Sequence, residues 1–141
     1  MSFRRPLLAL WLVVAALCAT SPAAHAQSTH WQTQADRVIK AVDAAEAVFA
    51  KGDVDGAKRS VTEAYFQVFE DSKLEAAIRR HVSAKRAAEI EKYFATLRKA
   101  MTANDAAQVK EVAQSLRQAV AVEAKGLDAA NVAPGVFEVN Q

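Results

Sequence analysis

Residues 83–101 read SAKRAAEIEKYFATLRKAM, and this stretch decides the fold class. Its apolar positions recur at intervals of three, four, three and four: Ala87, Ile90, Phe94, Leu97 and Met101. Residues at these intervals share one face of an α-helix, so the stretch predicts an amphipathic helix with one buried side. Ser83 stands just before the stripe and is a favourable N-cap residue.

The same periodicity recurs on both sides of this stretch, over residues 32–51, 53–71 and 105–126. The apolar stripes of these three segments are Ala35, Val38, Ile39, Val42, Ala45 and Phe49; Ala57, Val61, Ala64 and Val68; and Val109, Val112, Ala113, Leu116 and Val120. A shorter helix is predicted over 72–81, because Ser72 and Glu75 have the spacing of a capping box. Its inward residues are Leu74 and Ile78.

Two similar turns join the long helices. Lys51-Gly52 ends one helix and Asp53 or Asp55 can cap the next, and Asn104-Asp105 likewise ends one helix and caps another. The predicted fold is therefore all-α: an antiparallel four-helix bundle made of two helical hairpins, with 72–81 as a short linking helix. Residues 27–126 form this bundle domain, and 127–141 are predicted to be a flexible C-terminal tail.

The composition excludes several classes of protein. A chain of 141 residues with 52% hydrophobic and 24% charged residues suits one packed domain rather than a disordered protein. Only 4 Gly and 3 Pro are present, which disfavours a Gly-rich nucleotide-binding fold and favours helix.

The N-terminal residues have the pattern of a secretory signal peptide. Arg4 and Arg5 precede an apolar run over 7–19, and Ala24-His25-Ala26 places small residues where a signal peptidase requires them. We expect residues 1–26 to be removed by cleavage after Ala26 and the protein to be exported to the periplasm.

Two alternatives for this segment are a membrane anchor and a lipoprotein. The apolar run is too short to span a bilayer, and Leu17 before Cys18 does not suit lipid attachment. Removing 1–26 takes away the single Cys and lowers the 18 Lys and Arg to 16, against 16 Asp and Glu. The expected mature protein therefore has no thiol and no basic excess that would favour nucleic acid.

Phe66 does not fit a simple two-sided helix. On a wheel of about 100° per residue it lies opposite the apolar stripe of 53–71, whereas Tyr65 lies beside that stripe. Either Phe66 is a singly exposed aromatic, or it is covered by 72–81 or by a partner protein. Tyr65 and Phe66 are therefore the candidate partner-binding residues.

Three carboxylates, Glu70, Glu75 and Glu91, lie at or near the edges of the predicted packing surfaces. Carboxylates bind hard cations and iron, and they also form salt bridges with arginine. Arginines near them in the sequence or on the same helix are Arg79, Arg80 and Arg98. Glu70, Glu75 and Glu91 are accordingly candidate metal ligands, with iron as the metal, or else salt-bridge residues at helix edges. No Glu-x-x-His pair is present, so the usual di-iron carboxylate bundle is excluded.

No motif for catalysis is present. The sequence lacks a phosphate-binding loop, a nucleophile elbow and an HExxH motif, and we expect a non-enzymatic protein. It also lacks a CxxCH haem attachment motif. A haem held without covalent attachment between His30 and Met101 remains an alternative without specific support.

A resemblance to a known family is carried by residues 64–78, AYFQVFEDSKLEAAI, and by the segments 82–87, 90–94 and 97–101 that follow. Over roughly 60–101 the order of residues resembles the exported helical domain that precedes the membrane helices in many bacterial members of the high-affinity iron permease family. The positions that match the family pattern are Tyr65, Phe66, Glu70, Glu75, Ser83, Arg86, Glu91 and Phe94. The chain departs from the permease itself, since it has no apolar span after the predicted signal peptide and no Arg-Glu-x-x-Glu motif.

The resemblance implies a non-enzymatic, exported accessory protein associated with iron uptake. Such a protein would bind iron weakly, dock on an iron permease, or do both. One alternative is a metal-free periplasmic adaptor that binds other proteins. A less favoured alternative is a small haem-binding electron carrier.

Overall fold

The computed structural model describes residues 29–137, and all regular secondary structure within this range is helical. The elements in chain order are α1 (His30–Ala50), α2 (Val54–Glu63), the π-helix η1 (Ala64–Glu70), α3 (Leu74–His81), α4 (Ala84–Thr102), α5 (Ala106–Ala129) and the short 3-10 helix η2 (Pro134–Phe137). The predicted all-α class is confirmed. The predicted signal peptide, 1–26, lies outside the described residues.

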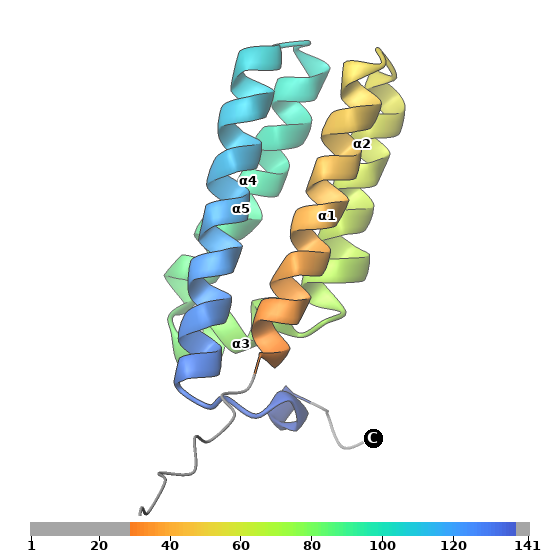
Figure 1. The fold of residues 1–141 in the computed structure, drawn as a ribbon. Helices are drawn as coiled ribbons and strands as arrows, with labels where there is room; N and C mark the ends of the chain where they lie inside the picture. Colours follow the sequence, from red (N-terminus) through yellow and green to blue (C-terminus); the bar gives the residue numbers. More distant parts are fainter. Residues whose placement is uncertain (1–28, 138–141) are drawn as a thin grey trace, which may run out of the picture.

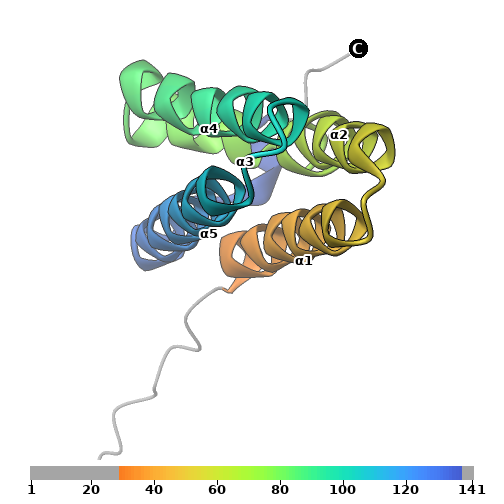
Figure 2. The ribbon, with the colours of Figure 1, turned by 90° about the horizontal axis from the view of Figure 1, so that it is seen from above.

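The four long helical segments run lengthwise beside one another, and α3 lies across one end (Figure 1). Seen from above, α1 is flanked by α2 and α5, and α4 is likewise flanked by α2 and α5 (Figure 2). The turns from α1 to α2 and from α4 to α5 lie at the same end, away from α3 (Figure 1). Within 29–137, no helix combines the length and the apolar character needed to cross a membrane.

The predicted apolar stripes form the core. Every predicted stripe residue of α4 and α5 is buried, and so are the two inward residues predicted for α3. In α1 the smaller stripe residues are buried, whereas Ile39 and Phe49 are only partly buried against the core. The 3.6-residue periodicity therefore identified the inner faces of α3, α4 and α5 correctly, and that of α1 for its smaller residues.

Side-chain caps fix three of the helix starts. The carboxylate of Asp53 accepts a hydrogen bond from the Gly56 amide at 2.8 Å, and Asp105 accepts one from Gln108 at 3.0 Å. The hydroxyl of Ser83 accepts a hydrogen bond from the Arg86 amide at 3.0 Å. Each cap satisfies an amide that has no partner inside its own helix, as the sequence predicted.

The capping box predicted at the start of the short helix does not form. α3 begins at Leu74, its N-cap residue is Lys73 with a φ of 65°, and no side chain caps it. The Ser72 hydroxyl oxygen instead accepts a long hydrogen bond, of 3.4 Å, from the Leu74 amide. The left-handed backbone at Lys73 takes the chain out of η1, so the helix starts at a sharper bend than the sequence indicated.

The predicted end of the last helix was wrong. Gly126 keeps a helical backbone, α5 continues to Ala129, and Leu127, Asp128 and Val132 are buried. The expectation of a flexible tail therefore fails for residues 127–132, because burying the apolar side chains of Leu127 and Val132 stabilises the chain beyond the glycine. Residues 138–141 lie outside the described range.

Asp128 caps α1 from the far end of the chain. Its carboxylate accepts hydrogen bonds from the Trp31 amide at 3.0 Å and the Gln32 amide at 2.9 Å, and from the Gln32 side chain at 3.1 Å. The indole nitrogen of fully buried Trp31 donates to the Val132 carbonyl at 2.8 Å. Thr29, the residue before α1, makes no side-chain cap. Asp128, which is 97 positions after Trp31, thus caps the N-terminus of α1 in place of a local residue. The positive end of the helix dipole also stabilises its negative charge.

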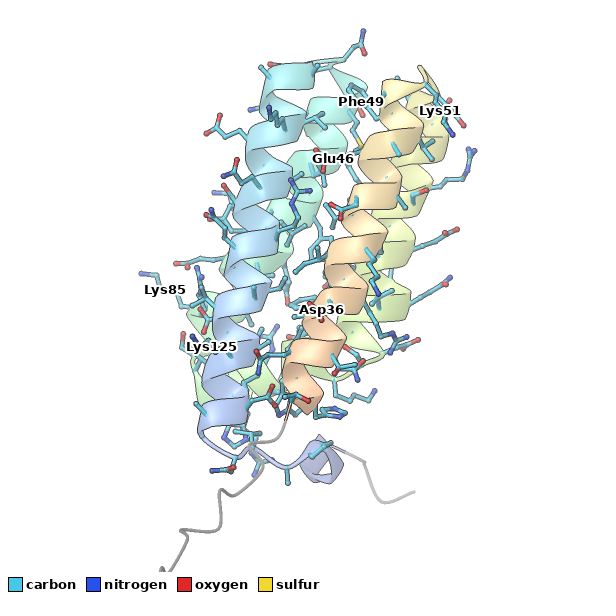
Figure 3. All side chains as sticks on the ribbon, in the orientation of Figure 1. Asp36, Glu46, Phe49, Lys51, Lys85 and Lys125 are labelled. Atoms are coloured by element: carbon cyan, nitrogen blue, oxygen red, sulfur yellow. The ribbon has the colours of Figure 1, made fainter. Side chains whose placement is uncertain are left out.

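Farther along the same pair of helices, Arg117 on α5 forms ion pairs with two carboxylates of α1. Its guanidinium lies 2.9 Å from Asp43 and also contacts Glu46, which Figure 3 labels on α1. These groups are partly exposed to solvent, so they contribute less to stability than the buried contacts of Asp128.

We expect Asp128→Ala to destabilise the protein substantially. The change orphans two buried or partly buried amides of α1, and each unsatisfied donor costs roughly 1–3 kcal/mol. Asp105→Ala is the matched control, because it removes an exposed carboxylate cap that costs about 1 kcal/mol. Urea unfolding at neutral pH measures both. Equal losses in the two variants would contradict the structural role assigned to Asp128.

Candidate functional site

The segment Ala64–Glu70 is wound as a π-helix rather than as a continuation of α2. The Asp71 amide donates to the Phe66 carbonyl, five residues earlier, at 3.2 Å. The wider turn changes which residue follows Ala64 into the core: Phe69 is fully buried, and Val68 is only partly buried. The prediction that Val68 lies in the core is wrong, because the spacing of a regular α-helix does not apply to this segment. Such π segments are rare and occur often at functional sites.

Three aromatic rings from two elements pack together beneath the π-helix. The ring centroids of Tyr65 and Phe69 lie 5.3 Å and 5.4 Å from that of Phe94 on α4. Separations in this range are typical of stabilising aromatic pairs. The cluster fixes η1 against α4, and so it holds the residues on the outer side of η1 in place.

Phe66 lies on that outer side. Its side chain is 52% exposed, and its ring meets Tyr65 edge to face at 4.8 Å. The alternative in which Phe66 is buried under 72–81 is therefore wrong for this chain. The two remaining interpretations are an exposed aromatic and a partner-binding residue.

Arg79 on α3 brings two of the predicted carboxylates together. Its Nε lies 2.6 Å from Glu75 Oε1, one turn earlier on the same helix. Its Nη2 lies 2.7 Å from Glu91 Oε1 on α4 and also contacts Glu75. The side chains of Glu75 and Glu91 are only 16% and 29% exposed, whereas that of Arg79 is 47% exposed. Two half-buried carboxylates from different helices thus share one partly exposed cation.

Glu70 joins the same region through Tyr65. The side chain of Glu70 lies near the Tyr65 hydroxyl and interacts with it. Burial raises the pKa of Tyr65, and the interaction with Glu70 and the negative charges of Glu91 and Glu75 raise it further. Tyr65 is therefore a neutral hydrogen-bond donor at physiological pH. We call Glu70, Glu75 and Glu91 the carboxylate cluster.

The charges of this cluster are not fully compensated. Burial raises the pKa of Glu91, and the nearby Glu75 adds to this effect even though Arg79 opposes it. The pKa of Arg79 is raised as well, chiefly by its hydrogen bond to Glu75. A raised pKa means that the surroundings of Glu91 disfavour its charged form. An additional positive charge nearby would therefore stabilise the cluster.

In the described part of the chain, no group of three or more His, Cys, Asp or Glu side chains is arranged to hold a metal ion. The guanidinium of Arg79 lies between Glu75 and Glu91. Of the two interpretations of these residues, metal ligands or salt-bridge residues, the second describes the observed geometry of Glu75 and Glu91.

The other residues that carried the family resemblance have structural roles. Ser83 caps α4. The guanidinium of Arg86 lies 2.7 Å from Glu123 on α5 and 3.2 Å from Glu89 on α4. These contacts connect the start of α4 to α5, and they do not involve Glu70, Glu75 or Glu91.

A haem ligated by His30 and Met101 does not fit the fold. His30 begins α1 at the end of the molecule that holds α3, and Met101 is next to the last residue of α4, at the opposite end (Figure 1). Helices of this length separate their ends by about 25–30 Å, which is far beyond the span of one iron's two axial ligands.

Two functional features were missed from the sequence. The π winding leaves no mark in a pattern analysis that assumes 3.6 residues per turn. The sequence does not distinguish Arg79 from Arg80 and Arg98 as the partner of both glutamates, although its position four residues after Glu75 is the spacing at which helical side chains pair.

Comparisons with models of protein families, with curated proteins and with solved structures gave no match to this chain.

We expect the free energy of unfolding to fall as the pH rises through the titration range of Glu91. The folded state raises the pKa of Glu91, so between the unfolded and the folded pKa it binds more protons than the unfolded state does. The contribution of that proton to the free energy of unfolding is fully present below the pKa of Glu91 in the unfolded state. It is lost as the pH rises through the pKa of Glu91 in the folded state. Glu91→Gln should flatten this part of the pH profile, measured by urea unfolding at a series of pH values. Glu111→Gln, which changes an exposed glutamate of α5, is the control and should keep the wild-type slope. A wild-type slope in Glu91→Gln would contradict the assignment.

Proposed function

We propose that this chain is a non-enzymatic, exported helical protein that serves iron uptake and binds iron weakly at its carboxylate cluster. One observation carries the proposal. Residues spread over 65–91 that match the pattern of the iron permease domain come together at one place, where η1, α3 and α4 meet.

The chemistry of the cluster suits a hard cation. Glu70, Glu75 and Glu91 offer oxygen ligands only, and one arginine in contact leaves an excess of negative charge. Oxygen ligands without His or Cys favour Fe³⁺, Mg²⁺ or Ca²⁺ over softer metals and give modest affinity. Iron is chosen among these cations because of the family resemblance. An incoming ion competes with Arg79 for the same carboxylates, which lowers its affinity further.

The proposal includes export and a partner. Cleavage after Ala26 would release the helical domain into the periplasm, where an iron permease is the proposed partner. The exposed ring of Phe66, fixed by Tyr65 beside the carboxylate cluster, supports a docking role at this place.

The proposed architecture is the antiparallel four-helix bundle of two hairpins expected from the sequence. Its support is the order of neighbours: α1 contacts α2 and α5, and α4 also contacts α2 and α5. In this arrangement α3 closes one end and carries Glu75 and Arg79 to Glu91.

A metal-free adaptor is the second candidate. The observation that favours it is the Arg79 guanidinium, which already provides Glu75 and Glu91 with a positive partner. In that case the exposed Phe66 is the functional feature and the cluster is structural.

Iron titration distinguishes the two candidates. Ferric citrate, compared with citrate alone, should raise the melting temperature by a few degrees, because a ligand at ten times its Kd stabilises by about 1.4 kcal/mol. The double variant Glu75→Gln/Glu91→Gln should lose this effect. Arg79→Gln should increase the affinity for iron, since it removes the competing cation, and this increase is not expected from a purely structural arginine.

Arg86→Gln is the matched control for the last variant, because Arg86 also bridges two glutamates but lies outside the cluster. It should leave the iron affinity unchanged. Absence of saturable stabilisation in both the wild type and Arg79→Gln would contradict the iron proposal and favour the adaptor.

A further inference from the structure

An open groove runs along the outside of the molecule between α2 with η1 and α4, which lie side by side (Figure 2). Its wider half, of about 880 Å³, extends from Asp55 to Ala103. Its narrower half, of about 240 Å³, ends at Phe66 and Glu91. Thr62, Ala95 and Arg98 line both halves, so the two form one continuous surface, which we call the α2–α4 groove.

Small side chains on facing helices leave this space open. Ala95 on α4 and Ala103, the residue just after α4, present only methyl groups to it. Arg98 contacts Thr62 on α2 across it, at 3.2 Å. From Asp55 to Phe66 the groove follows eleven helical steps, or about 16 Å at 1.5 Å per residue. That length corresponds to three turns of a helix laid along it.

The wider half is basic. It is lined by four cations, Lys58, Arg59, Arg98 and Lys99, and by two acids, Asp55 and Glu63. One of these cations, Lys58, is paired with Asp55 at 3.3 Å. Among the ion pairs of residues 29–137, none involves the other three cations.

This local excess of positive charge contrasts with the chain as a whole. Beyond the predicted signal peptide the chain has 16 Lys and Arg and 16 Asp and Glu, since Arg4 and Arg5 account for the other 2 of the 18. Three cations without a carboxylate partner are therefore gathered on one side of an otherwise balanced chain. Such a patch attracts an acidic ligand and orients its approach.

The narrower half differs in character. Phe94 and Tyr65 line it, the half-exposed ring of Phe66 forms its wall, and Glu91 places a negative charge at its end. Aromatic side chains in this setting are the usual anchor points of protein interfaces. The groove therefore has a direction, basic at the α2 start and aromatic at the η1 end.

We propose that the α2–α4 groove binds an amphipathic helical segment of a partner protein that is acidic at one end and carries a bulky apolar residue at the other. The acidic end lies against Arg59, Arg98 and Lys99, and the apolar residue packs on Phe66. The orientation of the segment follows from the concentration of cations in the wider half, whereas the narrower half has one cation, Arg98, and one carboxylate, Glu91, which is paired with Arg79. This inference deepens the proposed docking role and does not depend on iron.

A pair of designed peptides provides the probe. Both are helical, about 18 residues long so that three turns are stably formed, and both carry leucines in the second half. The first half of one carries three glutamates on the same face, and the first half of the other carries lysines there. The reporter is an environment-sensitive fluorophore on Ala95→Cys, in a Cys18→Ala background so that the label is unique. The same label on Ala121→Cys, an exposed position of α5, is the control.

The acidic peptide should change the fluorescence at position 95 in a saturable manner and leave position 121 unchanged. The lysine peptide should bind at least about tenfold more weakly, and added salt should weaken the acidic peptide. Arg59→Glu/Lys99→Glu should reduce affinity by about tenfold or more, and so should Phe66→Ala. Lys40→Glu/Lys110→Glu makes the same change of charge on exposed positions of α1 and α5 and should have no such effect.

Equal binding of both peptides, or equal effects of the two charge reversals, would overturn the proposal. So would a concentration-dependent dimer that Phe66→Ala abolishes, because a second copy of the chain would then occupy the groove. Peptide binding without any effect of iron would remove the iron proposal alone, whereas stabilisation by iron without peptide binding would remove this inference alone.

Discussion

The π winding of Ala64–Glu70 is the constraint on which the arrangement of this protein's outer surface depends. The wider turn places Phe69 in the core five residues after Ala64, and it leaves Phe66 outside. A regular α-helix would bury Val68 instead and would turn the following side chains by about a third of a revolution. The ring contacts of Phe69 and Tyr65 with Phe94 offset the poorer hydrogen-bond geometry of the π turn. The same contacts hold Tyr65 where its hydroxyl reaches Glu70.

Two carboxylates of this molecule, Asp128 and Glu91, differ in burial and in the partners that compensate their charge. Asp128 is fully buried, and three N–H donors around α1 satisfy it. Because it is fully enclosed, it is not accessible to a ligand, and its role is to close the fold. Glu91 is partly exposed, shares its arginine with Glu75, and has a raised pKa. A carboxylate that its own protein compensates incompletely is the one that gains most from an additional cation.

The parts of the fold that local rules control were predictable from the sequence. Apolar spacing gave the inner face of α4, and single residues such as Ser83 and Asp105 gave helix starts, because a cap acts on amides only three residues away. The cap on α1 was not predictable in this way, since Asp128 is separated from Trp31 by 97 positions and the pairing exists only once the chain has folded. The predicted break at Gly126 failed for a related reason. A glycine does not end a helix where tertiary packing stabilises the residues after it. Here the burial of Leu127, the residue after Gly126, stabilises the continued helix.

The candidate site was predictable as a set of residues but not as a geometry. The three glutamates were identified by their positions at helix edges, yet nothing in their spacing indicated that Arg79 would join Glu75 to Glu91 across two helices. Glu91 also lines the aromatic end of the α2–α4 groove. A cation that neutralises Glu91 would therefore change the charge at that end of the groove. If both ligands bind, thermodynamic linkage requires that a docked partner change the affinity for the cation by the same factor. The direction follows from Coulomb's law: a partner whose positive group approaches Glu91 competes with the cation, and one whose nearest groups are neutral does not.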